Sequence, residues 1–293
     1  MELHIYADDT QIYTSVCPTS NDGLNQAVSK IEQCVCEVQE WMTQNFLKLN
    51  AAKTEVQVFG FRAQLSKLTL PSVSIAGIDI AIQADPVKDL GVMLDRGMSM
   101  SAQVTKITKA ANYHLTNIGR VRKMLTAEST KLVVHSLVTS RLDYCNSLLV
   151  GISESQVKRL INVQRTAARL IRRKRKFDPI TSDLIDLHWL PIRQRIDFKI
   201  LVLVYKSCHK QSPDYITEML QRKTSCRQLR STASSTPSFI ERRTSHSTFA
   251  DRSFSCYAPR VWNKLPEIIR DAESVNFFRK LLKRHLFEIA YKQ

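Results

Sequence analysis

Two short apolar runs open the chain and predict a pair of strands. Leu3 and Ile5 lie in the first run, Ile12 and Tyr13 in the second, and residues of these types favour a half-buried strand. Asp residues, which tolerate the backbone angles of tight connections, separate the two runs. We therefore expect two antiparallel strands joined by a short turn.

A helical pattern follows this predicted hairpin. Ser20 or Asn21 can cap a helix, and the apolar residues after them are spaced by three or four positions. This apolar stripe contains Leu24, Val28, Ile31, Val35, Val38 and Trp41. After a loop that contains Lys53, the β-prone run from Val56 to Phe61 predicts a further strand.

The rest of the chain is predicted to be mainly helical. Its periodic segments are Ser101 to Leu125, the stretch after Thr126 up to Leu149, Val157 to Lys176, Asp183 to Tyr205 and Ser274 to Tyr291. The expected fold class is α+β, with a small antiparallel sheet and one covering helix, followed by a mainly α-helical body.

Asp8 and Asp9 are the residues whose side chains best fit a chemical role. Two carboxylates at a rigid turn are suitable oxygen ligands for Mg²⁺. Acidic residues are also common in solvated turns, so an Asp-Asp pair alone does not define a metal site. The interpretation depends on the segments that follow.

Those segments resemble the reverse transcriptases of non-LTR (LINE-type) retrotransposons, most closely the jockey-like group. Tyr6-Ala7-Asp8-Asp9 resembles catalytic motif C, and Leu47 to Glu55 resembles motif D. Lys88 to Val92 is similar to the family's strand that follows the palm, near the primer grip. Further similar segments follow in family order over nearly the whole chain: Arg141 to Asn146, Leu187 to Ile192, Arg252 to Ser255 and Trp262 to Pro266.

The resemblance implies a palm-remnant sheet followed by a helical thumb and a C-terminal region. It implies Mg²⁺-dependent DNA synthesis, with an RNA template and a DNA primer or product as partners. Asp8 and Asp9 would be catalytic metal ligands, Lys53 would protonate the leaving pyrophosphate, and Tyr6 would border the primer terminus. Lys53 could equally be an exposed loop lysine. The implied domains are residues 1–97 (partial palm), 98–177 (thumb-like), 178–222 (helical), 223–259 (basic, rich in Ser, Thr and Arg) and 260–293 (amphipathic helix).

In the family, motifs A and B precede motif C, and the metal site needs the motif A aspartate. Only seven residues precede Asp8 here. We therefore expect a truncated polymerase, inactive alone, whose missing upstream part is a possible partner. Two alternatives stay open: a noncatalytic remnant that binds RNA or DNA through its basic thumb and tail, and a decayed product with no stable function.

Charge is distributed unevenly along the sequence. Residues 1–100 contain 7 Lys and Arg against 12 Asp and Glu, and the remainder contains 36 against 15, for a net charge of +16. The densest basic segment, Val157 to Lys176, is predicted to bind a nucleic-acid backbone. A solvated helix face or a nuclear targeting signal would have a similar composition. Its candidate binding residues are Lys158, Arg159, Arg165, Arg169, Arg172, Arg173, Lys174, Arg175 and Lys176.

The remaining features concern location. The longest apolar run of the later helices is much shorter than the roughly twenty residues that cross a bilayer, so no membrane partner is expected. The seven scattered cysteines are typical of reduced thiols. Together with the acidic residues near the start, which do not fit a signal peptide, they predict an intracellular protein of the nucleus, the cytoplasm or both.

The segment 223–259, rich in Ser, Thr and Arg, contains four aromatic residues. Phe239, Phe249, Phe254 and Tyr257 are interpreted as core anchors in preference to base-stacking platforms.

Overall fold

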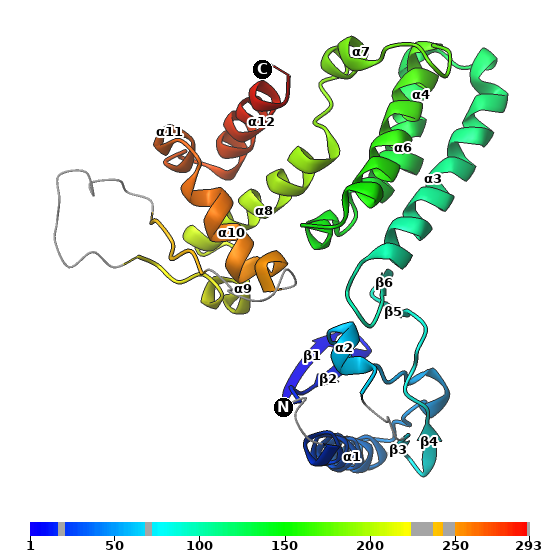
Figure 1. Ribbon diagram of the computed structural model, residues 1–293, viewed down its shortest axis with the longest axis vertical. Coiled ribbons are helices and arrows are strands. Elements are labelled where there is room, and N and C mark those ends of the chain that lie inside the picture. Colours follow the sequence, from blue (N-terminus) through cyan, green and yellow to red (C-terminus); the bar gives the residue numbers. More distant parts are fainter. Residues whose placement is uncertain (17–20, 68–71, 224–236, 243–249, 292–293) are drawn as a thin grey trace. The chain divides into compact units, whose positions relative to one another are not determined.

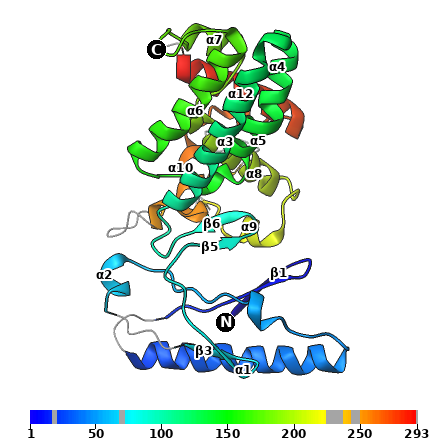
Figure 2. The same ribbon diagram turned by 90° about the vertical axis from the view of Figure 1, so that its right-hand side faces the viewer.

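A computed structural model describes residues 1–16, 21–67, 72–223, 237–242 and 250–291. The chain divides into two compact units, Met1–Ala102 and Gln103–Gln293. Within the described ranges, the strands form three separate two-stranded antiparallel sheets in the first unit, and the second unit is built from helices (Figures 1 and 2). The expected α+β class is therefore confirmed.

The first unit begins with the predicted hairpin. Its elements are β1 (Glu2–Tyr6), β2 (Asp9–Tyr13), α1 (Asn21–Gln44), the 3-10 turn η1 (Ala51–Lys53), α2 (Arg62–Leu65), β3 (Val73–Ile75), β4 (Ile78–Ile80), β5 (Val87–Asp89) and β6 (Val92–Leu94).

The core of the first unit forms between α1 and the β3–β4 hairpin, which lie side by side in Figures 1 and 2. Val73, Ile75 and Ile80 are buried, and Val28, Ile31 and other apolar side chains pack against them. The predicted helix is confirmed, and its apolar stripe faces the sheet because the spacing of three and four keeps those residues on one side. The apolar stripe of α1 is longer than the short β3–β4 hairpin, so Trp41 near the end of the helix is 58% exposed.

Two strand predictions in this unit are wrong. Val56 to Phe61 forms no strand; only Val56 makes an isolated bridge, to Ile82. Lys88 to Val92 is not one strand: it comprises the end of β5, a turn at Leu90 and Gly91, which both have positive φ, and the start of β6. Such paired positive angles are typical of two-residue hairpin turns.

The second unit contains the remaining helices. Its elements are α3 (Ser101–Val121, whose first two residues lie in the first unit), η2 (Arg122–Met124), α4 (Ala127–Val134), the π-helical turn η3 (His135–Thr139), α5 (Ser140–Asp143), η4 (Asn146–Leu149), α6 (Glu154–Arg172), α7 (Thr181–Asp186), α8 (Ile192–Cys208), α9 (Asp214–Glu218), η6 (Ala250–Arg252), α10 (Phe254–Asn263), α11 (Glu267–Arg270) and α12 (Val275–Tyr291).

Helix α8 lies at the centre of this unit and packs against α6, α10 and α12. Tyr205 of α8 stacks on Phe278 of α12, and its hydroxyl donates to the carbonyl of Ala272. Trp262 of α10 is fully buried and lies beside Phe278. Helices α3, α4 and α6 lie side by side in a second group (Figures 1 and 2).

Two long helices predicted from periodicity are interrupted. The stretch after Thr126 ends its helical course at Cys145, whose φ of 48° is left-handed. Asp183 to Tyr205 is split between α7 and α8, since Pro191 lacks a backbone N–H and so disfavours one helix that continues through it. Phe239 is 2% exposed and lies near Trp262, which confirms it as a core anchor, whereas Phe249 lies outside the described residues.

Candidate functional site

Asp8 and Asp9 lie at the end of the β1–β2 hairpin. Five residue pairs join the strands, from Glu2 and Tyr13 to Tyr6 and Asp9. The turn consists only of Ala7 and Asp8, so Asp8 is at the tip and Asp9 already belongs to β2. All four residues of the motif-like segment are exposed, and Tyr6 is 68% exposed.

The hairpin has two chemically different faces. Because side chains of paired strands alternate, Leu3, Ile5 and Ile12 share one face and Tyr6, Asp9 and Gln11 share the other. Leu3 is 52% and Ile5 66% exposed, so the apolar face is largely open. The carboxylate of Asp9 therefore projects from the polar face, next to the ring of Tyr6 on the opposite strand.

A third carboxylate, Asp89 of β5, lies near this polar face. The amide of Gln11 donates to Asp89 Oδ1 at 2.5 Å. Partial burial and the negative charge of Asp9 raise the pKa of Asp89, while the Gln11 hydrogen bond opposes the rise. Sequence reasoning missed Asp89 because it read this residue as part of a single strand; the hairpin-type Leu90-Gly91 pair was the available signal.

The donor set at the hairpin is too small for two Mg²⁺ ions. Within the residues that the structure describes, no group of three or more His, Cys, Asp or Glu is placed to hold a metal ion. Asp89 Oδ1 accepts from Gln11, and Asp89 is not grouped with Asp8 and Asp9 in a metal-binding arrangement, which leaves the exposed carboxylates of Asp8 and Asp9. Two carboxylates fit one weakly held Mg²⁺, which usually keeps several waters. A two-ion centre needs further ligands, so we derive no catalytic step through metal ions.

Lys53 makes no described contact with the carboxylates of Asp8 and Asp9. It ends η1, is exposed, and no hydrogen bond or ion pair in the described part of the chain joins it to Asp8 or Asp9. The structure thus pairs Tyr6 with Asp9 but does not bring Lys53 to them. Its role in proton transfer stays a prediction from the resemblance.

The predicted basic segment is partly helical. Helix α6 ends at Arg172, and Arg173 closes it with a left-handed φ of 55°, so Lys174 to Lys176 lie beyond it. Val157, Leu160 and Ile171 are buried, as the periodicity predicts. Lys158 and Arg165 point from the exposed side of the helix.

Five of the predicted binding cations are engaged within the protein, and one of them, Arg173, donates to the carbonyl of Leu125 at 3.4 Å. Arg159 donates to the hydroxyls of Thr105 and Thr108, both at 3.1 Å, and Arg169 donates to the carbonyl of Asp178. Arg172 pairs with Asp183 and Asp186, and Lys174 also pairs with Asp183.

These contacts change the charge balance of the segment. The sequence contains no acidic residue between Val157 and Lys176. In the folded chain, however, Asp183 of α7 lies next to the end of this segment and pairs with Arg172 and Lys174. The side chains of Lys158, Arg165, Arg175 and Lys176 have no ion-pair partner among the described residues. The surface available to a phosphate backbone is therefore smaller than the sequence implied.

A buried arginine fixes the end of α6. Arg122 of η2 donates to the carbonyls of Leu170 and Ile171 and also to that of Leu125. Carbonyls at a helix C-terminus lack intrahelical partners and favour a cation. The periodicity of Ser101 to Leu125 gives no signal that Arg122 is buried against α6.

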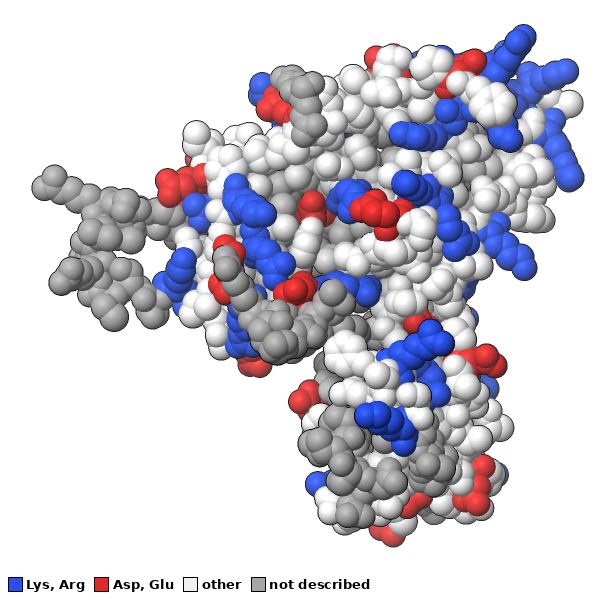
Figure 3. All heavy atoms as spheres, viewed as in Figure 1, with Lys and Arg blue, Asp and Glu red and all other residues white. Residues whose placement is uncertain are grey.

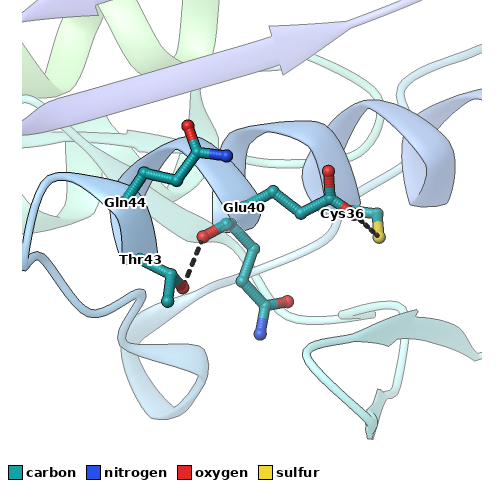
Figure 4. Close-up of a pocket in the computed structure, with 5 residues that line it drawn as sticks. Cys36, Glu40, Thr43 and Gln44 are labelled. Carbon is teal, nitrogen blue, oxygen red and sulfur yellow. Dashed lines mark hydrogen bonds between the residues drawn. The ribbon is translucent and has the colours of Figure 1, made fainter.

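A shallow hollow on the first unit lies along α1. It measures about 390 Å³ and is lined by Cys36, Gln39, Glu40, Thr43 and Gln44. Figure 4 shows that these side chains come from one helix, and the Thr43 hydroxyl already donates to the carbonyl of Gln39. The Cys36 thiol donates to Glu40 Oε1 at 4.0 Å, a long contact between side chains at the surface, and the five lining residues include no His, Lys or Arg to activate a thiol.

Comparison with protein-family models, with curated proteins and with solved structures finds no match to this chain. Among the described residues, no helix is both long and apolar enough to cross a bilayer.

Proposed function

We propose that this chain is part of a non-LTR retrotransposon reverse transcriptase, consisting of a palm segment with motifs C and D and a helical thumb region. One observation carries the proposal. The Tyr6-Ala7-Asp8-Asp9 segment forms the end of a fully paired hairpin, with Asp8 at the tip and Asp9 opposite Tyr6.

The geometry supports a role in positioning oxygen ligands. Catalytic carboxylates must be held within a fraction of an ångström, and paired strands restrict their backbone more than a free loop does. Here the paired backbone extends to Asp9, the residue next to the tip. In polymerases, Mg²⁺ held by such carboxylates activates the 3′-hydroxyl and stabilises the leaving pyrophosphate.

The limited donor set defines what the chain contributes. Asp8 and Asp9 supply part of a nucleotidyl-transfer centre, and a further carboxylate must come from another polypeptide segment. We therefore expect the chain to incorporate no nucleotide by itself. Activity requires a segment with the motif A aspartate and motif B.

A second candidate function is noncatalytic binding of RNA or DNA by the second unit. The exposed cations Lys158, Arg165, Arg175 and Lys176, which have no ion-pair partner among the residues that the structure describes, favour it. Such binding would weaken steeply with salt, because each phosphate contact releases a counterion.

Primer extension tests the first candidate. The chain alone and the chain fused behind an upstream palm and fingers segment are compared on a primed RNA template, with and without Mg²⁺. The proposal predicts Mg²⁺-dependent extension by the fusion only. A soluble, folded fusion that still binds primer-template but extends no primer would contradict it.

A further inference from the structure

The exposed side of α3 contains cations and no acidic residue. From Ser101 to Met124, which covers α3 and η2, the sequence contains Lys and Arg but no Asp or Glu. Figure 3 shows Lys and Arg side chains gathered along the edge of the second unit that α3 forms in Figure 1. This contrasts with α6, where the carboxylates of α7 neutralise part of the charge.

Two cations of α3 share one stripe with an exposed aromatic ring. Lys109, Tyr113 and Arg120 are separated by four and seven residues, spacings that return to nearly the same side of a helix. Val104, Ile107 and Leu115 occupy the opposite side and are buried. The stripe therefore points away from the core.

The stripe residues are available to a ligand. Lys109, Arg120 and Lys123 are exposed and have no ion-pair partner in the described part of the chain. Arg120 makes one long hydrogen bond, of 3.5 Å, to Asn117. Tyr113 is 65% exposed.

These features match the requirements for binding a single nucleic-acid strand. Proteins that bind single strands combine cations along the backbone with aromatic rings on which bases stack. Lys109 and Arg120 lie about 16 Å apart along the helix axis, and Tyr113 lies between them. Bases within a duplex are already stacked and cannot use an aromatic ring on a convex helix.

We propose that the α3 stripe, formed by Lys109, Tyr113, Arg120 and Lys123, binds a single strand of RNA or DNA, with its cations on phosphates and the Tyr113 ring stacked on a base. The proposal rests on the nucleic-acid-binding candidate function and does not require DNA synthesis. It assigns the main contact to α3 in place of the α6 segment.

Binding of the whole chain to a labelled U-rich RNA of about ten nucleotides tests this. Tyr113→Ala should weaken binding about tenfold, because one base stack is lost, and Tyr113→Phe should bind as the natural chain does. Lys109→Gln with Arg120→Gln should flatten the log-log salt slope by about 0.7 for each cation removed. Lys280→Gln with Lys283→Gln, which removes the same charge from α12, is the matched control and should leave the slope unchanged.

The results that would contradict the proposal separate the α3 stripe from the candidate function of nucleic-acid binding. If the natural chain binds RNA and the α3 variants bind equally well, the stripe is refuted while the candidate function stands. If the natural chain binds no RNA, both fail. A preference for a duplex of equal length, an unchanged Tyr113→Ala affinity, or equally tight binding to vesicles of anionic lipid would each refute single-strand binding by this stripe. Circular dichroism of every variant excludes unfolding as the cause.

Discussion

Arg195 of α8 holds both carboxylate oxygens of Asp143 with one guanidinium nitrogen, at 2.6 and 2.7 Å, while its Nε donates to the carbonyl of Leu190. Two segments far apart in sequence, Arg141 to Asn146 and Leu187 to Ile192, are thereby joined. The Arg195 side chain is 14% exposed, so its charge depends on these partners.

Asp143→Ala should therefore destabilise the second unit by about 2–3 kcal/mol, because it leaves a largely buried guanidinium without its counterion. Chemical denaturation measures the effect. The exposed pair of Arg193 and Glu154 supplies the control, and Arg193→Ala should cost less than about 1 kcal/mol. Equal costs for the two variants would contradict this role of Arg195.

The second unit should lose stability in mild acid through His135. Burial and the positive charges of Arg195 and Lys131 lower the pKa of His135 in the folded protein. The unfolded chain then binds more protons below about pH 6.5, the ordinary value, so stability falls as the pH drops through that region.

His135→Phe removes the titrating group and keeps a ring against Trp189, which His135 contacts edge-on. The variant should show a flatter dependence of unfolding temperature on pH than the natural protein. An identical pH dependence would assign the acid sensitivity to other groups.

Asp89→Asn should stabilise the first unit near neutral pH. The folded pKa of Asp89 is raised above its ordinary value of 3.8, so the folded state binds the proton more tightly and stability falls as the pH rises through this interval. The asparagine oxygen can still accept from Gln11 but does not repel Asp9. Thermal unfolding at neutral pH measures the gain, and a loss of stability would show that the Asp89 charge is favourable.

Gly151→Ala should destabilise the second unit by about 2–4 kcal/mol, through left-handed strain and overpacking. Gly151 has a φ of 62°, and an added Cβ would lie 2.7 Å from Cγ of Arg252. Arg252 cannot move away freely, since its Nε donates to the carbonyl of Val150. Gly119→Ala in α3 is the control: its nearest neighbour is 3.9 Å away, and helix propensity predicts a gain of about 0.5–1 kcal/mol. Denaturation curves of both variants should shift in opposite directions.

Sequence periodicity predicted the elements whose contacts are local or repetitive. The α1 stripe, the start of α3 at Ser101 and the apolar side of α6 all follow from spacing. Strand prediction failed for Val56 to Phe61 because a strand requires a neighbour, and beyond Val56 the chain makes contacts of other kinds. Gln57 donates through its side chain to the carbonyl of Asp85, and the Gly60 amide to that of Arg96.

The helix ends were less accessible to sequence reasoning. The left-handed conformation of Cys145 is uncommon for a residue with a Cβ, and propensity gives no reason to expect it there. The charge of the α6 segment was likewise overestimated, because its neutralisation depends on Asp183 and Asp186 folding back from α7. Tertiary contacts of this kind have no signature in the run itself.

The hairpin site was predicted in part. Spacing and turn chemistry placed Asp8 and Asp9 at the connection between two strands, and the structure refines this by putting only Asp8 in the turn. Asp89 lies at the site because Gln11 of β2 donates to it; the Leu90-Gly91 pair indicated its hairpin in the sequence, but no local pattern indicated this contact.

The most direct measurement is the rate of nucleotide incorporation by the fusion with an upstream palm segment, compared between the natural sequence and Asp8→Asn. Asp79→Asn, which changes an exposed aspartate of β4, is the control. If Asp8 belongs to an incomplete nucleotidyl-transfer centre, Asp8→Asn lowers the rate by more than about 100-fold, since loss of even the partners of metal ligands costs about 10–100-fold, and Asp79→Asn leaves the rate unchanged. Equal rates for all three proteins, or incorporation by the unfused chain, would contradict the account.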